Sequence, residues 1–359
     1  MTLLGEAVYE RAYYYCPHCR SGFCPSDEEF RIEGQKTPAA NEVTALAGVL
    51  HPFDEAATEV LPKMCGINLS ASTVQKVTER VGEAVAQRRA AGEVFGLARP
   101  WKWHRDASGK TVAYIGLDAT GVRQQGVHAE QSEGRMAWVG VIFNPHLLCR
   151  KRRVRMWDSR YVAGLMSLAE IGQQLRREAQ AVGIAQADRV VALTDGGAGL
   201  ENCLLNALGG VAHEIVFILD FWHASEHLQE FVNVFLPDER LREEQMKIWC
   251  HQLKHSGGSA VLQTLMALDL ARASPQVLEA HRQLTGYLRN NLHRTDYPTY
   301  VKNGWQIGSG KVESACKSVI CQRLKCSGMR WRAYGTTALC QLRALYKSRL
   351  WTQYWQPAP

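Results

Sequence analysis

Residues 190–228 read VVALTDGGAGLENCLLNALGGVAHEIVFILDFWHASEHL, and this stretch decides the fold class. Val190–Leu193 and Ile215–Leu219 are short apolar runs of strand-forming residues. Leu200–Leu208, between them, has the pattern of a helix. A strand, a helix and a second strand in this order predict neighbouring parallel strands in an α/β sheet.

Three further predicted strands precede this unit and extend the sheet. Val112–Leu117 and Ala137–Phe143 are apolar runs rich in strand formers and bounded by turn residues. Leu147–Trp157 is the third, a more exposed strand that carries Arg150–Arg153 and Arg155. Tyr161–Val182 then carries apolar residues at helical spacing. Three consecutive strands followed by helix, strand, helix and strand predict a mixed sheet with helices on its faces.

Asp118, Asp195 and Asp220 each follow a predicted strand. Ligands of open α/β sheets bind beyond the carboxyl ends of the strands, so these carboxylates are expected to share one site. Like charges placed together repel unless a cation binds them, and Mg²⁺ prefers oxygen ligands. For Asp195 alone, which precedes two glycines, a plain turn residue is the alternative interpretation.

A fourth acid, Glu313, follows the glycine loop Gly308-Ser309-Gly310. Glu313 borders the apolar face of the predicted helix and is expected near the sheet with its carboxylate accessible. The alternative is a surface ion pair with Lys317, which would stabilise the helix by only ~0.2–0.5 kcal/mol. The residues that form the apolar face are Val312, Ala315, Cys316, Val319 and Ile320.

Positive charge is concentrated near the carboxyl end. The chain has 359 residues and a net charge of +7, but residues 311–349 alone hold nine Lys and Arg against one acid, Glu313. Such a segment with aromatic residues beside it indicates a polyanion partner, and a solvated pair of basic helices is the alternative. The expected phosphate contacts are Lys311, Lys317, Arg323, Lys325, Arg330 and Arg332.

The composition also bears on compartment. No apolar run approaches the ~20 residues that span a bilayer, and the first residues lack the basic segment of a secretory signal. The 11 cysteines are an odd number scattered along the chain, which favours reduced thiols. We therefore expect a cytoplasmic protein without a membrane partner.

Several motifs, taken together, resemble the transposases of the ISKra family of insertion sequences. The resemblance covers residues 10–355, and its motifs occur in the expected order. They are Gly116-Leu117-Asp118, Leu193-Thr194-Asp195-Gly196, Leu219–Leu228, Ile307–Glu313, Arg323-Leu324-Lys325 and Ser327–Trp331.

This resemblance implies an RNase H-like core in which Asp118, Asp195 and Glu313 form an Asp-Asp-Glu (DDE) triad that binds Mg²⁺ or Mn²⁺. Asp220 and His223 match an accessory pair. The implied activity is cleavage of DNA at the ends of an insertion sequence, followed by attack of the freed 3′-hydroxyl on target DNA. The implied assembly is a homo-oligomer on double-stranded DNA, in the nucleoid of a bacterial cytoplasm.

Cys16-Pro17-His18-Cys19 resembles the second knuckle of a zinc ribbon, with Cys16 and Cys19 as candidate Zn²⁺ ligands. A closed zinc site needs four ligands, and residues 1–15 contain no cysteine or histidine. We therefore expect a chain truncated at its amino end, with an incomplete zinc site. The alternatives are an atypical site completed by His18 and Cys24, or no bound zinc.

The chain thus divides into five predicted regions. Ser70 resembles a helix cap, and Val74, Val77 and Val81 follow at helical spacing, which is typical of the second helix of a helix-turn-helix. The regions are a partial zinc ribbon (1–35), this helical DNA-binding region (36–108), the first part of the RNase H-like core (109–230), a helical insertion (231–300), and the glutamate helix with basic C-terminal helices (301–359).

Two other functions remain open. His223-Ala224-Ser225-Glu226-His227 has the spacing of a zinc peptidase motif, in which His223 and His227 bind the metal and Glu226 acts as base. That alternative leaves the other acids and the basic segment unexplained. A transposase-derived DNA-binding protein without catalysis is the second alternative, because its amino terminus is expected to be incomplete.

Overall fold

The centre of the molecule is a mixed sheet. The computed structural model describes residues 1–3, 5–96, 98–126, 133–147 and 155–356. Strands β4, β5 and β6 are antiparallel neighbours, β7 is parallel to β4, and β8 is parallel to β7, in the order β6-β5-β4-β7-β8. The predicted mixed α/β sheet is therefore confirmed. Its strands are β3 (His104–Arg105), β4 (Thr111–Arg123), β5 (Gly134–Leu147), β6 (Arg155–Gly164), β7 (Arg189–Thr194) and β8 (Ile215–Leu219).

Two sequence predictions about this sheet were wrong in their bounds. The third strand is β6, Arg155–Gly164, and not Leu147–Trp157, of which 148–154 lie outside the described residues. The helix that follows begins at Leu168 and not at Tyr161, because Ser167 caps it and accepts a hydrogen bond from Glu170 N. The apolar residues near 161 therefore belong to a strand.

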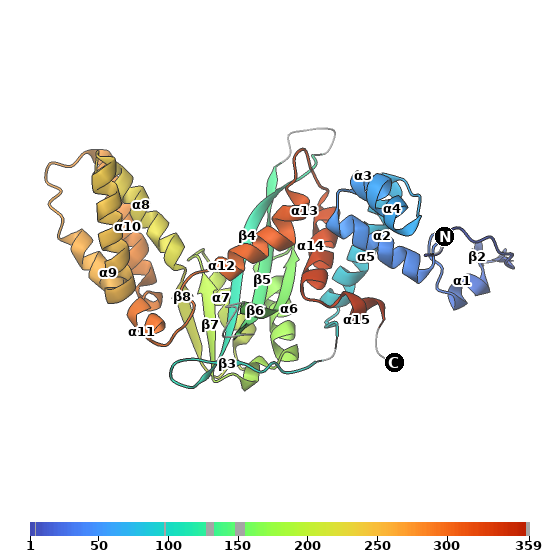
Figure 1. Cartoon of the computed structure of the whole chain (residues 1–359), viewed down its shortest axis with the longest axis horizontal. Coiled ribbons are helices and arrows are strands. Elements are labelled where there is room, and N and C mark those ends of the chain that lie inside the picture. Colours follow the sequence, from blue (N-terminus) through green and yellow to red (C-terminus); the bar gives the residue numbers. More distant parts are fainter. Residues whose placement is uncertain (4, 97, 127–132, 148–154, 357–359) are drawn as a thin grey trace.

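Side chains of β4 alternate between two hydrophobic cores. Ala113 and Ile115 face α6 (Leu168–Ala181) and α7 (Leu200–Leu208), whereas Val112 and Tyr114 face the layer that holds the C-terminal helices. Helices thus cover both faces of the sheet (Figure 1). A short helical turn, η3 (Ile184–Gln186), leads into β7.

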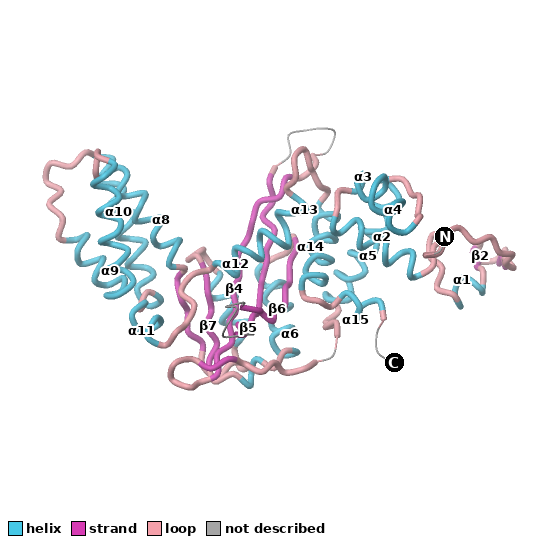
Figure 2. The backbone as a smooth tube through the Cα atoms, in the orientation of Figure 1, coloured by secondary structure: helices cyan, strands magenta, loops and turns pink. Residues whose placement is uncertain are grey.

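A helical lobe lies between β8 and the glutamate helix in the chain. It stands beside the sheet at the end opposite the amino terminus (Figures 1 and 2). Tyr297 Oη donates to Leu219 O at 3.0 Å, which ties the lobe to β8. Residues 231–300 are mostly helical, as expected, and the helices extend beyond this range at both ends, from Phe221 to Lys302. Its elements are α8 (Phe221–Phe235), α9 (Glu239–Met266), α10 (Pro275–Asn291), η4 (Leu292–Arg294) and α11 (Tyr297–Lys302).

The C-terminal segment crosses the sheet as one helical run. It consists of α12 (Gly310–Ala315), the π-helical turn η5 (Cys316–Cys321) and α13 (Gln322–Leu324). All five residues of its predicted apolar face are buried. Helices α14 (Ala333–Lys347) and α15 (Trp351–Trp355) follow.

The amino-terminal part is a hairpin followed by helices. Ser70 Oγ caps α5 (Ala71–Ala90) by accepting a hydrogen bond from Thr73 N, as predicted, and Val74, Val77 and Val81 of this helix are buried. The helical region ends at Ala90 rather than at 108, and β3 already lies within that range. The elements are β1 (Tyr14–Cys16), β2 (Ser21–Phe23), α1 (Pro25–Glu29), α2 (Pro38–Leu50), α3 (Phe53–Glu55), η1 (Ala56–Val60), α4 (Leu61–Cys65) and α5 (Ala71–Ala90).

Within the described residues, no helix combines the length and the apolar character that crossing a bilayer requires.

Candidate active site

The four predicted acids line one cavity of about 240 Å³. Asp195 follows β7 directly, Asp220 caps α8, and Glu313 lies on α12. Asp118 lies inside β4 rather than after it, since β4 continues to pair with β5 after its parallel pairing with β7 ends at Gly116. The acids therefore converge at the edge where the parallel strands end.

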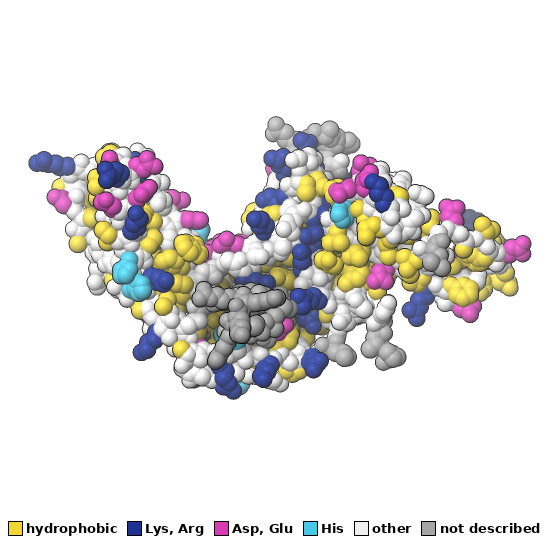
Figure 3. Space-filling model, viewed as in Figure 1, with side chains coloured by type: hydrophobic (Ala, Val, Ile, Leu, Met, Phe, Trp, Pro, Cys, Tyr) yellow, Lys and Arg dark blue, Asp and Glu magenta, His cyan; other side chains and the backbone are white. Residues whose placement is uncertain are grey.

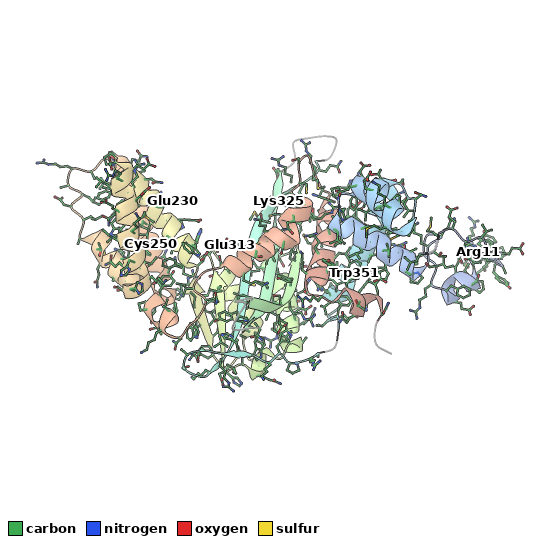
Figure 4. All side chains as sticks on the ribbon, viewed as in Figure 1. Arg11, Glu230, Cys250, Glu313, Lys325 and Trp351 are labelled. Carbon is green, nitrogen blue, oxygen red and sulfur yellow. The ribbon has the colours of Figure 1, made fainter. Side chains whose placement is uncertain are left out.

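Glycine at position 116 permits this convergence. A Cβ atom at Gly116 would lie 2.2 Å from Val312 Cγ2, so α12 packs against β4 at a distance that only glycine allows. Glu313 is the next residue after Val312, and it is exposed on the side of α12 that faces the helical lobe (Figure 4). Gly116 in β4 thus helps to set the position of Glu313, which lies far away in the sequence.

Asp118 is the partly buried member of the group. Its Oδ1 accepts from Ala119 N at 2.6 Å, and its Oδ2 lies 3.4 Å from Cys316 Sγ, which donates to it. Burial raises the pKa of Asp118 above its ordinary value, and the charges of Asp195 and Glu313 add to this effect. The carboxylates are therefore close enough to repel one another.

Asp195 is fixed by the turn that follows it. Its Oδ1 accepts from Gly197 N at 2.8 Å, as in a turn in which aspartate bonds the backbone two residues ahead. Asp195 therefore takes part in a turn, and it also lines the cavity.

Asp220 and Glu313 are linked through Ser309, whose part in the site the sequence analysis missed. Ser309 Oγ lies 2.6 Å from Asp220 Oδ2 and 2.8 Å from Glu313 Oε1. Asp220 is buried, and its Oδ1 also accepts from the backbone N–H groups of Ser309 and Trp222. Glu313 thus bonds to Ser309, and the described residues contain no ion pair between Glu313 and Lys317.

The first turns of α8 form the lobe side of the cavity. Trp222, His223 and Glu226 line it, and the Trp222 side chain is 63% exposed. Nδ1 of His223 lies 3.3 Å from Glu226 Oε2. His227, the second histidine of the peptidase alternative, has its ring centroid 4.9 Å from that of His223 and 4.0 Å from that of Tyr287.

No three His, Cys, Asp or Glu side chains in the described part of the chain form a group that could already hold a metal ion. Neither the carboxylates of the cavity nor the pair His223 and His227 forms such a group. Cys16 and Cys19, which are exposed on the β1–β2 hairpin, do not form one either. The oxygen donors of the cavity still suit Mg²⁺ or Mn²⁺ in chemistry. A divalent cation would also relieve the repulsion that contributes to the raised pKa of Asp118.

The basic residues divide into exposed and buried groups. Arg323 is 1% exposed and donates to Gly48 O, so its predicted role as a surface phosphate contact was wrong. Lys311 is half-buried and donates to Tyr161 Oη. The other predicted contacts, Lys317, Lys325, Arg330 and Arg332, are exposed.

The molecule is hollowed between the helical lobe and the α12–α13 run (Figure 3). Lys and Arg side chains gather on the wall of this hollow opposite the lobe (Figure 3). The acidic cavity and a basic surface therefore lie close together.

No protein-family model matches the chain, and no curated protein matches it significantly. A function is therefore inferred from the placement of its own residues.

Proposed function

We propose that the chain is a DNA transposase of the DDE type that cleaves the ends of an insertion sequence and joins them to target DNA. The observation that carries this proposal is that Asp118, Asp195 and Glu313, from three separate segments, line one cavity. A basic surface near that cavity would hold the phosphate backbone.

The topology supports the same proposal. Three antiparallel strands precede two strands that run parallel to the first of them, which is compatible with an RNase H-like core. The helical lobe occupies the chain between β8 and α12, where the proposed family carries an insertion.

Asp118, Asp195 and Glu313 would hold the divalent cations. Bound cations in such a site lower the pKa of an attacking water and stabilise the oxygen that leaves. The backbone N–H groups of Ala119 and Gly197 fix the two aspartates, and Ser309 orients Glu313. These contacts fix the orientation of the three carboxylates in the absence of DNA.

Two displacements at phosphorus would take place in this cavity. In the first, water oxygen attacks the phosphorus, the bond to the 3′-oxygen breaks, and a 3′-hydroxyl and a 5′-phosphate remain. In the second, that 3′-hydroxyl attacks a target phosphodiester, forms one new bond and releases one target 3′-hydroxyl. Protons lost by the attacking oxygens balance those gained by the leaving oxygens.

Calorimetric titration of Mn²⁺ into wild type and Asp195→Asn tests the proposal. Asparagine retains an oxygen for Gly197 N, so the turn should survive while the charge is lost. We expect Mn²⁺ to bind wild type and the control Asp269→Asn, an exposed acid on the lobe, but not Asp195→Asn. Nicking of supercoiled plasmid should follow the same pattern.

Other results would favour the alternatives. DNA binding without Mn²⁺ binding or nicking would favour a DNA-binding protein without catalysis. Tight Zn²⁺ binding that His223→Ala abolishes and Asp195→Asn leaves unchanged would favour the peptidase.

A further inference from the structure

A second cavity, of about 580 Å³, lies between α5 and the segment 328–334. We propose that this groove reads the sequence of duplex DNA, a role that rests on the proposed function and is separate from the catalytic cavity. Its walls include Ser72, Gln75 and Lys76 from α5, and Arg330, Arg332 and Tyr334 from the other side.

The groove is positively charged. Lys76, Arg330 and Arg332 are exposed on its two walls. Among the described residues that line the groove, Glu79 is the one acid, and it is buried and accepts from Gln75 Nε2 at 2.9 Å. Exposed cations therefore outnumber exposed acids in this described lining, as a phosphate backbone requires.

A buried cation adds to this charge. Arg323 lines the groove between the rings of Phe53 and Trp331, and no carboxylate of the described residues lies within ion-pair distance of it. Its Nη2 atom is buried and has no hydrogen-bond partner. Burial, together with the charge of Arg343, lowers the pKa of Arg323 to about 10, so it remains cationic at neutral pH.

Helix α5 presents a face suited to base edges. Ser72, Gln75 and Lys76 are spaced by three and four residues, so they share one side of the helix. Val74 and Val77 are buried on the other side, which fixes the orientation of α5. Hydroxyl, amide and ammonium groups on an α-helix are the groups that read bases in the major groove of B-DNA.

The opposite wall is held in place by the sheet. Trp331 N donates to Arg123 O, and Gln125 N donates to Trp331 O at 2.7 Å, so segment 328–334 is bound alongside the end of β4. A Cβ atom at Gly335 would lie 2.7 Å from Glu79 Oε1, which shows how closely α14 approaches α5. The two walls therefore form one preformed surface, in which Arg330 and Arg332 would position phosphates while α5 reads bases.

Selection from a pool of duplexes with a randomised centre tests the proposal with the full chain. EDTA removes divalent cations, so catalysis has no part in the result. We expect wild type to enrich one sequence motif. We expect the double variant Gln75→Ala, Lys76→Ala to lose about tenfold or more of that preference. Its affinity for one fixed unrelated duplex should fall less.

Two further variants complete the design. Arg330→Ala with Arg332→Ala should weaken binding to all sequences and reduce the slope of log affinity against log salt by about two. The control for the α5 variant, Arg282→Ala with Gln283→Ala, also removes one cation and one amide, here from exposed positions on α10, and should behave as wild type. Melting temperatures show whether each variant folds.

Three results would overturn the groove proposal: no enriched motif with wild type, the same motif with the α5 variant, or preference for duplex RNA. Its failure is distinguishable from failure of the catalytic proposal. An enriched motif without Mn²⁺ binding or nicking would leave the groove standing and reject catalysis. Nicking without an enriched motif would support the catalytic proposal and reject the groove proposal.

Discussion

Ser309 Oγ lies 2.6 Å from Asp220 Oδ2, and this contact joins two residues that are 89 positions apart in the sequence. The same oxygen lies 2.8 Å from Glu313 Oε1. A hydroxyl has one hydrogen to donate, so Ser309 mediates between two carboxylates rather than satisfying both at once. Asp220 is buried, its Oδ1 accepts from two backbone N–H groups and its Oδ2 contacts Ser309 Oγ, which makes it a positioning residue for the loop that begins α12.

Ser309→Ala should therefore lower nicking activity by about 10–100-fold, because Glu313 loses the contact that orients it. Ser309→Thr retains a hydroxyl and should restore most of the activity. The alanine variant also leaves Asp220 Oδ2 without a donor, which should lower the free energy of unfolding by about 1–3 kcal/mol. Denaturant unfolding and plasmid nicking measure the two effects, and nicking by Ser309→Ala at the wild-type rate would contradict the positioning role.

Gly116→Ala should push α12 away from β4. The added Cβ would lie 2.2 Å from Val312 Cγ2, and such overpacking costs about 1–3 kcal/mol. The matched control is Gly121→Ala on the same strand, where the added Cβ would lie 3.9 Å from Met136 Sδ. The free energy of unfolding of Gly116→Ala should therefore be lower than that of Gly121→Ala by about 1–3 kcal/mol.

Val312→Ala supplies the second half of this experiment, since it removes the methyl groups that clash. In the double variant Gly116→Ala, Val312→Ala, the two effects should be less than additive, with a coupling of about 0.5–3 kcal/mol. Strict additivity would mean that this contact does not set the position of α12.

Parts of the fold and of the site could be predicted because the signals are local. Apolar runs that end in Asp195 and Asp220 mark two strand ends directly, and the structure confirms both. Asp118 was expected after its strand, but β4 continues because β5 still pairs with it. Pairing with a neighbouring strand is not visible in the strand's own sequence.

Long-range contacts account for the remaining differences. Arg323 looks like a surface cation in a basic segment, yet Phe53, from the amino-terminal helices, covers it together with Trp331. Ser309 looks like part of a flexible glycine loop, and its partner Asp220 lies in a distant segment. Neither partner could be identified before the helices were placed on the sheet.

Trp222→Ala should reduce DNA processing without affecting the fold. The indole packs against Gly308 on one side, where a Cβ atom would lie 2.9 Å from Trp222 Cδ1, and it is otherwise 63% exposed at the cavity. An exposed ring beside the proposed catalytic acids is placed to stack on a nucleobase, which contributes about 1–3 kcal/mol. Nicking should therefore fall about tenfold or more, while the unfolding free energy should change by less than about 0.5 kcal/mol.

Trp222→Phe serves as the control for ring character, because it retains an aromatic face of smaller area. It should keep most of the activity that Trp222→Ala loses. Equal activity of wild type and the alanine variant on plasmid DNA would rule out a stacking role.

Asp106 gives a pH-dependent prediction for the loop that leads to α12. Its carboxylate accepts from Trp305 Nε1 at 3.0 Å and from the Ser108 hydroxyl at 2.6 Å. Burial alone would raise the pKa of Asp106, but these bonds, with backbone donors at Ser108 and Lys110, outweigh it and lower the pKa below its ordinary 3.8. A carboxyl group whose pKa is lowered by folding stabilises the folded state above its unfolded pKa, and this contribution is lost as pH falls through the folded value.

Asp106→Asn should therefore be less stable than wild type at about pH 7, by about 1–3 kcal/mol, because the amide cannot accept all of these bonds. The difference should narrow as the pH falls below 3.8, because the unfolded chain then binds a proton that the folded carboxylate takes up only at lower pH. Urea unfolding of both proteins across this range measures the difference, with Asp269→Asn as the exposed control. A difference that stays constant with pH would show that the charge of Asp106 does not stabilise the folded state.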